Sequence, residues 1–503
     1  MAPSPLSPDR SPPRNSYDAA SHRSRATIMS PVVPHLDSIG HVFRAYDIRG
    51  VADTELTEDF AYNLGIAFAA HLKETQRRAS SVALGMDNRP SSPSLHAAVR
   101  DGLVSQGLIV RDLGLTSTPQ LGFAVWHYLL DGGICVTGSH NSPANNGFKL
   151  EGRGAYPLAG RDISHLRDRM SMAASQGSTS GRITPLDICD PYLRTLSTLV
   201  SCDRPLTVVI DAGNGVMSDV APRLFRLLGC NVVELFCEMD SSFPNHIPNP
   251  EDPMNLRALK RVVVESRADV GFAFDGDGDR LGVVDDTGSI FGAEHTLMLL
   301  ARDLLGRHPH VPILLDVKSS RTAIEDISAQ GGSPTLTKTG HSLIRQRMAD
   351  EGILLAGEHS GHFFCAEDFC VTSDALLAAT RLSAVIARST VPLSQVLGPV
   401  PTRYSSGLLE LRVAEEHKRA IVEMVARSLS KNCRTNTIDG VRVETKDAWA
   451  LVRASNTGPR LTLRFEADTE ERLRDIQTMV LAHLAAVEAE LCVHTQDSGA
   501  LSL

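Results

Sequence analysis

Short apolar runs that end in polar loops are the main pattern through most of the chain. Three of these runs end in an aspartate and a polar turn, at residues 82–88, 208–215 and 313–320. A second apolar run follows each of them, starting at Ile134, Val270 and Ile353. Between the runs, residues 95–108 and 256–264 carry apolar side chains at helical spacing. The pattern predicts three successive strand, helix and strand units in which both strands are buried.

Each second run leads into a loop of unusual composition. The three loops read Thr137-Gly-Ser139-His140-Asn141, Asp275-Gly-Asp277-Gly-Asp279-Arg280 and Gly357-Glu358-His359-Ser360-Gly361-His362. Ligands of α/β sheets bind just beyond the carboxyl ends of the strands. We therefore expect these three loops to carry the functional residues.

The last hundred residues change character. Residues 441–445, 449–454 and 461–466 have the composition of strands, and a helix follows them. Asp468 is predicted to cap this helix, with Glu471 completing a capping box. The helix is predicted to bury one apolar stripe, formed by Leu473, Ile476, Val480, Leu484, Val487 and Leu491. This part reads as a smaller α+β domain.

The chain is therefore predicted to be α/β, with three tandem α/β domains followed by the α+β domain. The expected boundaries are 38–185, 186–290, 291–401 and 402–503, after a disordered Ser- and Pro-rich tail over 1–37. The tail lacks the apolar middle of a secretory signal. An organelle transit sequence is a less favoured alternative, and Met29 is an alternative start. The Gly/Ser-rich segment 176–181 is predicted to be a flexible surface loop.

Composition narrows the class of protein. The 503 residues are 42% hydrophobic and carry a net charge of −9, which argues against a surface that binds nucleic acid as a whole. No apolar run approaches the roughly 18 residues of a membrane span. The nine cysteines include no CxxC pair and have no zinc-site spacing. We expect a cytoplasmic protein with reduced thiols and no membrane partner.

The loop from Asp275 to Arg280 carries the sharpest chemical signal. Alternate residues of an extended segment face the same way, so three carboxylates converge, and hard oxygen ligands in this number suit Mg²⁺. A calcium EF-hand begins with the same spacing. Its sixth and twelfth positions would be Arg280 and Asp286 here, where the EF-hand needs Gly and Glu. We therefore predict a magnesium site.

The other loops are weaker signals when taken singly. The Ser139 hydroxyl can carry a phosphoryl group facing the metal. The Glu358 loop suits sugar hydroxyls, although a metal or acid/base site is an alternative. A fourth loop, Arg453-Ala-Ser455-Asn456-Thr457-Gly458, is rich in donors and suits an anion such as phosphate. Metal, hydroxyl, polyol and anion loops in four consecutive domains describe a single site.

These motifs occur in the order found in the α-D-phosphohexomutase superfamily, which the chain resembles over nearly all of residues 38–503. It is most similar to the bacterial phosphomannomutase/phosphoglucomutase branch, through Phe43-RAYDIRG, the Ser139 and Asp275 loops, Lys338-TGH, Gly357-EHSGH and Arg453-ASNT. The resemblance implies mixed sheets around a central active-site cleft. It also implies an isomerase that interconverts hexose 6-phosphates and hexose 1-phosphates of mannose and glucose.

The resemblance also implies a role for each matching residue. Ser139 is the phosphoserine, and Asp275, Asp277 and Asp279 hold Mg²⁺ together with the Ser139 phosphate. The residues implied to surround the reacting group are Arg49, His140, Lys149, Arg280 and His341. Those implied to bind the substrate are Tyr46, Lys318, Glu358, Ser360, His362, Arg453, Ser455, Asn456 and Thr457. A hexose 1,6-bisphosphate is the implied activator, a phosphosugar is the only implied partner, and a monomer is expected, with a dimer as the alternative.

Two positions depart from the pattern of the branch. Ser142 stands where Pro is frequent, and Gly458 stands where an acidic residue or Thr is common; neither change removes a functional atom. Three other functions remain as alternatives. A phosphoglucosamine mutase is disfavoured by Thr137-Gly-Ser139 and by Glu358-His359. A haloacid dehalogenase phosphatase is disfavoured by Asp279 and the three tandem units, and a sugar-phosphate sensor without activity by the intact Ser139 and aspartates.

Overall fold

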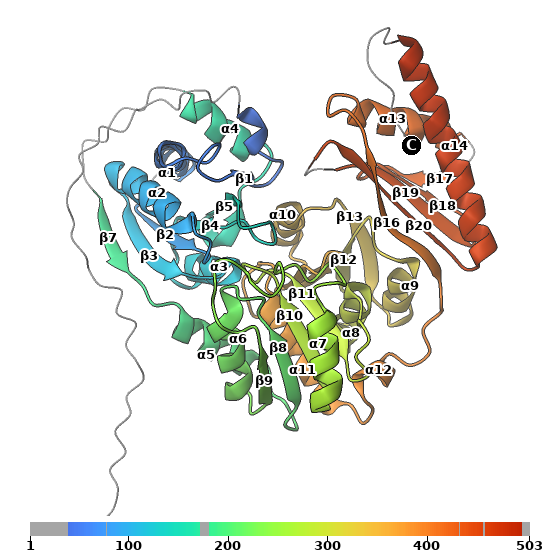
Figure 1. The fold of residues 1–503 in the computed structure, drawn as a ribbon, viewed down its shortest axis with the longest axis horizontal. Helices are drawn as coiled ribbons and strands as arrows, with labels where there is room; N and C mark the ends of the chain where they lie inside the picture. Colours follow the sequence, from blue (N-terminus) through green and yellow to red (C-terminus); the bar gives the residue numbers. More distant parts are fainter. Residues whose placement is uncertain (1–38, 77, 172–180, 432, 456–457, 495–503) are drawn as a thin grey trace, which may run out of the picture.

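Four β-sheets with their helices are arranged in an arc, with the first and the fourth at its two ends (Figure 1). The computed structural model describes residues 39–76, 78–171, 181–431, 433–455 and 458–494. The predicted tail over 1–37 and positions 176–180 of the predicted surface loop lie outside these ranges. The four sheets are formed by consecutive stretches of the chain, in the order in which the sequence patterns occur.

The first sheet has the strand order β1-β5-β4-β2-β3-β7, with β6 paired to β5. Strands β4, β2, β3 and β7 are parallel neighbours, whereas β5 is antiparallel to both β4 and β1. The elements of this part are η1 (Gly40–Val42), β1 (Ile48–Val51), α1 (Glu58–Thr75), β2 (Ser81–Met86), α2 (Ser92–Ser105), β3 (Ile109–Leu115), α3 (Thr118–His127), β4 (Gly132–Val136), β5 (Asn145–Gly152), η2 (Arg153–Ala155), β6 (Tyr156–Pro157), α4 (Arg161–Met170) and β7 (Arg182–Pro185).

The second and third sheets repeat one arrangement. Their orders are β11-β10-β8-β9 and β13-β12-β14-β15, and each contains three parallel strands followed by one antiparallel strand. The elements are α5 (Cys189–Leu199), β8 (Thr207–Asp211), α6 (Met217–Leu227), β9 (Asn231–Leu235), α7 (Arg257–Ser266), β10 (Val270–Phe274), β11 (Leu281–Asp285), α8 (Ala293–Arg307), β12 (Pro312–Asp316), α9 (Arg321–Ala329), β13 (Ser333–Thr337), α10 (His341–Glu351), β14 (Leu355–Gly357), β15 (Phe363–Cys365), α11 (Ala375–Arg388) and α12 (Leu393–Val396).

The repeated apolar runs are strands, as the sequence predicts. The runs that end in aspartate are β2, β8 and β12, and each pairs in parallel with the strand that leads into a functional loop, namely β4, β10 or β14. One predicted helix is misplaced. The segment predicted as 95–108 is helical over Ser92–Ser105, because the chain turns at Gly107, whose φ of 81° ends the helix.

The fourth sheet is antiparallel throughout, in the order β16-β20-β19-β18-β17. Helices α13 and α14 pack against it around a separate core that includes Ile476, Val480, Leu484 and Val487. The elements are β16 (Tyr404–Arg412), α13 (Lys418–Leu429), β17 (Arg434–Asn436), β18 (Val441–Glu444), β19 (Ala448–Ala454), β20 (Arg460–Ala467) and α14 (Glu470–His494). The side chain of Leu491 lies outside the described part.

The predicted cap of the last helix is wrong by one residue. The Thr469 hydroxyl, and not the Asp468 carboxylate, accepts the Arg472 N–H, at 3.2 Å. Asp468 is still tied to the sheet through its amide, which donates to Asp447, and its carboxylate accepts from Arg403 at 3.0 Å. The third residue of the helix is therefore Arg472, so the predicted capping box with Glu471 does not form.

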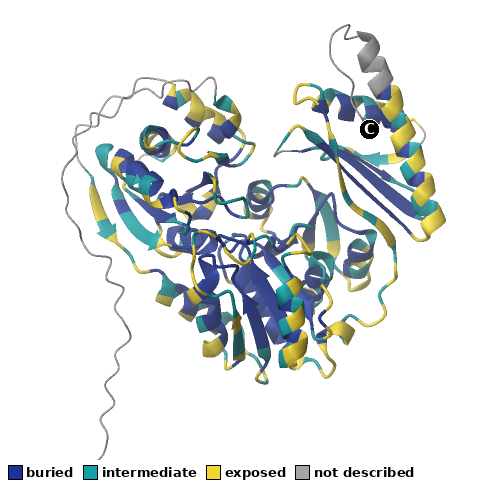
Figure 2. Ribbon diagram, in the orientation of Figure 1, coloured by how far each residue is buried: buried dark blue, intermediate teal, exposed yellow. Residues whose placement is uncertain are grey.

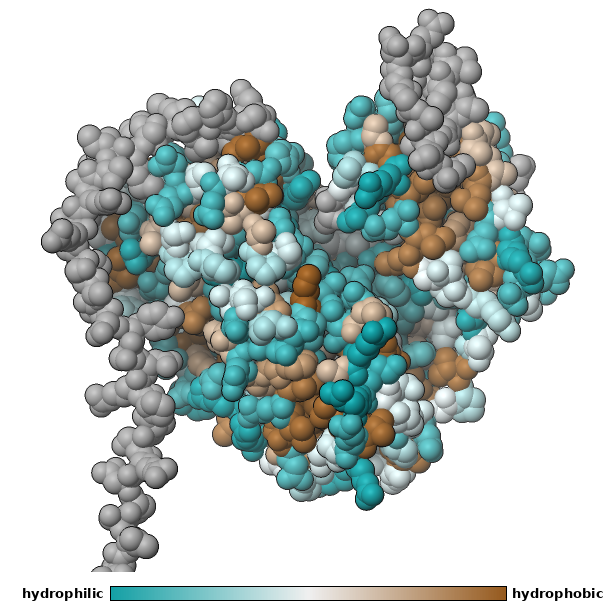
Figure 3. Space-filling view, viewed as in Figure 1, coloured by the Kyte–Doolittle hydropathy of each residue, from teal (hydrophilic) through white to brown (hydrophobic). Residues whose placement is uncertain are grey.

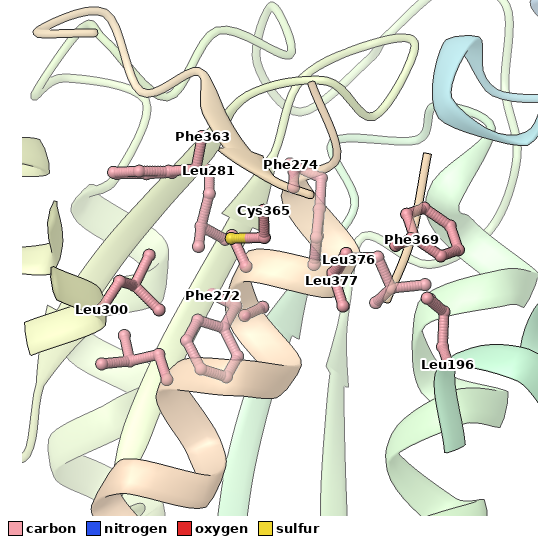
Figure 4. Packing of buried hydrophobic residues seen from close by; sticks show 14 of the residues in the cluster. Leu196, Phe272, Phe274, Leu281, Leu300, Phe363, Cys365, Phe369, Leu376 and Leu377 are labelled. Atoms are coloured by element: carbon pink, nitrogen blue, oxygen red, sulfur yellow. The ribbon is translucent and has the colours of Figure 1, made fainter. Parts of the chain in front are cut away.

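The first three sheets share one continuous apolar core. This core contains residues of α3, α6, α8 and α11, and strands such as β10, whose side chains are buried on both faces (Figure 2). Phe272 and Phe274 of β10 lie beside Phe363 and Leu376 of the following domain (Figure 4). Because this core crosses from one sheet to the next, the three α/β units form one rigid block. The fourth sheet has its own core and joins the block only through an interface.

That interface is built around Trp449. Its indole is buried, lies 3.7 Å from the Arg442 guanidinium and donates to Glu466 at 2.9 Å. Arg442 in turn donates to the carbonyls of Val317 and Ser319 at the end of β12. The contact thus combines arginines that donate to carbonyl and carboxylate groups with a small apolar cluster of Val317, Trp449 and Leu451. No helix among the described residues is long and apolar enough to cross a membrane.

The start of α14 provides a test of the corrected cap. Replacing Thr469 by Ala removes the side chain that accepts the Arg472 N–H, and should lower the free energy of unfolding by about 1 kcal/mol. Replacing Asp468 by Ala breaks only a surface ion pair, and should cost less than about 0.5 kcal/mol. Urea unfolding followed by Trp449 fluorescence, in a Trp126→Phe background, compares the two variants. The larger loss in Asp468→Ala would contradict the observed cap.

Candidate active site

The four functional loops meet in one cleft of about 200 Å³. Its walls come from all four sheets, and the molecule is hollowed between the first and the fourth (Figure 3). The lining residues are Tyr46, Arg49, His140, Glu251, Arg280, Lys318, Thr339, Gly340, His341, Glu358, Ser360, His362, Leu408, Glu410, Arg453, Ser455, Arg460 and Thr462. The predicted residues Ser139, Lys149, Asp275, Asp277 and Asp279 are buried next to these linings. Asn456 and Thr457 lie outside the described residues.

The three aspartates after β10 form a compact acidic cluster. They are 0% exposed, and one carboxylate oxygen from each lies within 4.8 Å of the others. The loop is closed by the Asp275 carboxylate, which accepts the amides of Asp279 and Arg280 at 3.0 and 3.1 Å. Burial and the two neighbouring carboxylates raise the pKa of Asp275 well above its usual range. Such crowding of negative charge is costly unless a cation compensates it.

The cluster fits a divalent cation. The Oδ1 atom of Asp277 is buried and has no hydrogen-bond partner among the described residues, so it has a lone pair free for a metal. The Oδ1 atom of Asp279 is also buried, and its nearest partner is His362 Nε2, at 3.3 Å. Lys149 supplies one compensating charge, because its ammonium group lies 2.6 and 2.5 Å from the Oδ2 atoms of the same two residues. Three carboxylate oxygens that leave room for further oxygen ligands are the donor set that Mg²⁺ prefers.

Ser139 faces this cluster from the first sheet. Its hydroxyl lies 2.9 Å from Asp275 Oδ2 and 3.2 Å from His140 Nδ1. The two loops are in direct contact, because a Cβ on Gly276 would lie only 2.4 Å from the Ser139 carbonyl oxygen. Glycine at position 276 is therefore required for the hydroxyl to reach the metal loop.

Cationic and imidazole side chains lie beside the acidic cluster and in the cleft next to Ser139. Burial alone would lower the pKa of Lys149, but Asp277 and Asp279 raise it, so its ammonium group remains charged. Burial lowers the pKa of both His140 and His341 well below the usual value, and nearby cations lower both further. These two rings are therefore neutral at pH 7. The structure brings together the groups predicted to surround the reacting atoms.

The sugar loop after β14 is held against the metal loop. The Leu281 amide donates to the Gly361 carbonyl at 3.0 Å, and Arg280 and His362 form a β-bridge. His362 lies between Glu358, at 2.8 Å, and Asp279, at 3.3 Å. Burial favours the neutral His362 ring, but these carboxylates raise its pKa. Burial would raise the pKa of Glu358, but His362 and Lys318 lower it to about 2, so Glu358 is an ionised hydrogen-bond acceptor in the cleft.

The anion loop lies on the opposite wall, after β19. Arg453 is buried, and its Nε donates to Asp439 at 3.0 Å. The same Asp439 oxygen accepts the amide of Thr339, in the Lys338-TGH motif, at 3.0 Å. Lys418 donates to the Ser455 and Gly458 carbonyls at 2.8 and 3.3 Å and so shapes the turn. The wall therefore presents the positive charge of Arg453 to the cleft.

Several residues of the site escape the sequence patterns. Glu251 and the pair Glu410 and Arg460 line the cleft, and Glu251 lies 3.1 Å from Arg280. Thr118, at the start of α3, donates to Asp277 Oδ2 at 2.5 Å. A Ser-Thr-Pro helix start at 117–119 is visible in the sequence, but it gives no indication that the helix points at the metal loop.

Matches to known proteins extend over the whole described body of the chain. Residues 40–176, 190–288 and 293–404 match the models of phosphoglucomutase/phosphomannomutase alpha/beta/alpha domains I, II and III, and residues 408–483 match the C-terminal domain. The chain is 41% identical to phosphomannomutase/phosphoglucomutase of Pseudomonas aeruginosa over 471 residues, covering 93% of the chain and 99% of that relative.

A second relative and a solved structure belong to the same family as these matches. Phosphoglucomutase of Neisseria gonorrhoeae is 41% identical over 444 residues, covering 87% of the chain and 95% of that relative. The crystal structure of a phosphoglucomutase/phosphomannomutase family protein from Burkholderia thailandensis superposes with a TM-score of 0.83 at 37% identity, covering 89% of this chain and 97% of that one. The chain therefore belongs to the phosphoglucomutase/phosphomannomutase family and is a phosphohexomutase.

Proposed function

We propose that this protein interconverts the 6-phosphates and 1-phosphates of glucose and mannose through a phosphoryl group carried on Ser139. The observation that carries the proposal is the position of the Ser139 hydroxyl, 2.9 Å from Asp275, beside a cleft whose far wall holds Arg453. A donor on one wall and an anion site on the other suit a substrate with a phosphate at one end and a hydroxyl at the other.

The first half reaction transfers the phosphoryl group from Ser139 to the free hydroxyl of the bound hexose phosphate. The Oγ–P bond breaks as the bond to the sugar oxygen forms, and the proton of the sugar hydroxyl passes to a neighbouring basic group. In the second half reaction, the other phosphate of the hexose 1,6-bisphosphate passes to Ser139. Its bond to the sugar oxygen breaks as the bond to Oγ forms, and the basic group returns the proton to the freed sugar oxygen. When bound, Mg²⁺ supplies charge neutralisation for the transferring phosphoryl group.

The chain's own groups hold the reactants in place. Asp275, Asp277 and Asp279 bind the cation, while Lys149, Arg49 and Arg280 stabilise negative charge around the phosphoryl group. His140 and His341 lie where they can exchange a proton with the sugar hydroxyl.

Recognition is divided between the sugar and the phosphate that is not transferred. Glu358 and Ser360 accept and donate hydrogen bonds to sugar hydroxyls, with His362, Lys318 and Tyr46 as further contacts. Arg453, Ser455, Asn456 and Thr457 bind the phosphate. If the contacts are made to O3 and O4, the configuration at C2 is read loosely, and both glucose and mannose phosphates are accepted.

We also expect a hexose 1,6-bisphosphate to activate the enzyme, because only this compound can phosphorylate a Ser139 that has lost its phosphate. We expect it to act as a monomer in the cytoplasm. Initial rates on glucose 1-phosphate, mannose 1-phosphate and glucosamine 1-phosphate, measured side by side, test the substrate class. A clear preference for the amino sugar would replace the proposal with a phosphoglucosamine mutase, and no turnover of any of them would favour a sensor.

The phosphoserine is tested directly by mass. The purified protein should contain a species heavier by one phosphoryl group, located at Ser139 by peptide mapping, because the catalytic cycle begins and ends with the phosphoenzyme. Ser139→Ala should lack this species and should lose nearly all turnover. Ser142→Ala, in the same loop, is the matched control and should keep it. A phosphoryl group on another residue would overturn the assignment.

Magnesium dependence is tested through the central carboxylate of the acidic cluster. Asp277→Asn removes one negative charge that faces the cation, so it should raise the Mg²⁺ concentration needed for half-maximal activity at least about tenfold. Asp286→Asn makes the same change just outside the loop and should leave the Mg²⁺ titration unchanged. Full activity of the parent enzyme in excess chelator would contradict the metal role.

The anion wall is tested through Arg453. Arg453→Ala removes a charge-assisted hydrogen bond of roughly 1.5 to 3 kcal/mol. It should therefore weaken glucose 1-phosphate binding by about one to two powers of ten, as measured by calorimetry. Arg427→Ala, on the exposed face of α13, is the control.

The same wall should also close on the substrate, because the fourth sheet has a core of its own. A hinge near residues 400–406, between Gly398 and Gly407, should lose hydrogen exchange when glucose 1-phosphate is added. Arg453→Ala should reduce this protection. Unchanged binding and unchanged exchange in the variant would remove the phosphate role of this loop.

A further inference from the structure

A buried guanidinium lies directly behind the Ser139 loop. Arg89 follows β2 and is 1% exposed. Its Nη2 donates to the carbonyls of Ser139 and Asn141 at 2.7 and 2.6 Å. Its Nη1 donates to the carbonyls of Ser142 and Asn145 at 2.5 and 3.0 Å. One side chain therefore gathers four carbonyl groups of the loop, with a planar geometry that no other side chain reproduces.

Asp87 fixes this guanidinium and the start of the same loop. Its Oδ2 accepts from Arg89 Nε at 3.0 Å, from the Thr137 hydroxyl at 2.8 Å and from the Gly138 amide at 3.1 Å. The Thr137 hydroxyl then accepts the Ser139 amide at 2.8 Å. Asp87 is buried and ends the β2 run, so the central strand of the sheet supports the loop from below. The Asp87–Arg89 pair thus holds both the amide and the carbonyl side of the loop.

The loop needs such support because its backbone is unfavourable. Ser139 has a φ of 52°, in the left-handed region that a residue with a Cβ rarely occupies. Gly138 can have no side chain, because its Cβ would lie 2.5 Å from Arg89 Nε. A serine in this conformation relaxes unless neighbouring groups hold its peptide units. Arg89 binds the carbonyl of that very residue.

The anchor also sets the spacing between Ser139 and the metal loop. The Ser139 carbonyl lies between Arg89 on one side and Gly276 on the other. The far side of the guanidinium is covered by the Phe243 ring of the next domain, at 5.5 Å, and the neighbouring Asn88 donates to the Asn214 carbonyl at 2.8 Å. The contact between the first and second domains that brings the serine and the aspartates together is therefore made beside Arg89.

We propose that Arg89, held by Asp87, is the positioning residue that keeps Ser139 in its left-handed conformation and aims its hydroxyl at the metal loop. It touches neither the substrate nor the reacting atoms. Its removal lets the loop relax, so phosphoryl transfer slows while substrate binding on the opposite wall is retained. This inference rests on the proposed role of Ser139 as the phosphoryl carrier.

The test separates phosphoryl uptake from binding. Dephosphorylated Arg89→Ala is mixed with glucose 1,6-bisphosphate, and the rate at which the protein gains a phosphoryl group is followed by intact mass. We expect this rate to fall at least about 100-fold, the effect of displacing a reacting group by about 1 Å. Glucose 1-phosphate affinity, measured by calorimetry, should stay within about threefold of the parent. Parent-like uptake would overturn the proposal.

Chemical rescue distinguishes positioning from a general loss of stability. Guanidinium ion at tens of millimolar should occupy the space left in Arg89→Ala and restore at least about tenfold of the lost rate. Urea, which has the same shape but no charge, should not. Arg381→Ala is the matched control. This buried arginine of α11 donates to the carboxylate and the carbonyl of Glu367, in the loop between β15 and α11. Its replacement should lower thermal stability and leave phosphoryl uptake unchanged.

A conservative variant, Arg89→Lys, provides a second test of the positioning role. If Arg89→Ala does not fold, Arg89→Lys takes its place, and its uptake should fall at least about tenfold because an ammonium group cannot reach four carbonyls at once. Uptake equal to the parent in Arg89→Lys, or a loss in Arg381→Ala as large as in Arg89→Ala, would overturn the positioning role. A parent enzyme that gains no phosphoryl group at Ser139 would instead overturn the proposed function.

Discussion

The crowding of three buried carboxylates in one short loop is the constraint on which the rest of the site depends. Asp275, Asp277 and Asp279 are fully buried within 4.8 Å of one another, so a substantial positive charge must lie nearby. Lys149 compensates part of the negative charge of these carboxylates, and a divalent cation would compensate the remainder. The second sheet supplies the carboxylates, whereas the first supplies Lys149 and Ser139. The chemistry therefore requires that these two sheets keep a fixed position relative to each other.

The core provides that rigidity. The first three sheets share one apolar cluster that runs through α3, α6, α8 and α11, so the serine, metal and sugar loops belong to one block. The fourth sheet has its own core and contacts the block through arginines that include Arg321, Arg442 and Arg464, and through the apolar cluster around Trp449. Hydrogen bonds from arginines to carbonyls can be exchanged more easily than close-packed apolar contacts. The proposed reorientation of a substrate with two phosphates would require the fourth sheet to move while the serine and metal loops stay in place.

Strain and support are paired at the serine. The buried Asp87–Arg89 pair and the close contact with Gly276 stabilise the left-handed backbone of Ser139. The Ser139 loop is therefore held by residues outside the cleft as well as by those that line it. Residues that do not contact the substrate determine the direction of the hydroxyl.

The sequence by itself determined the elements and the loops. Apolar runs that end in Asp87, Asp211 and Asp316 are the central strands of three sheets, because a buried strand between helices needs an unbroken apolar segment. The spacing of Asp275, Asp277 and Asp279 predicted their convergence for a similar local reason. The sequence misplaced the cap of α14 at Asp468, since the side chain that caps depends on which competing partner, here Arg403, is within reach. Only the tertiary structure decided that Thr118, Glu251, Asp439 and Arg89 belong to the site, because their partners lie on other strands and domains and no local pattern records a long-range contact.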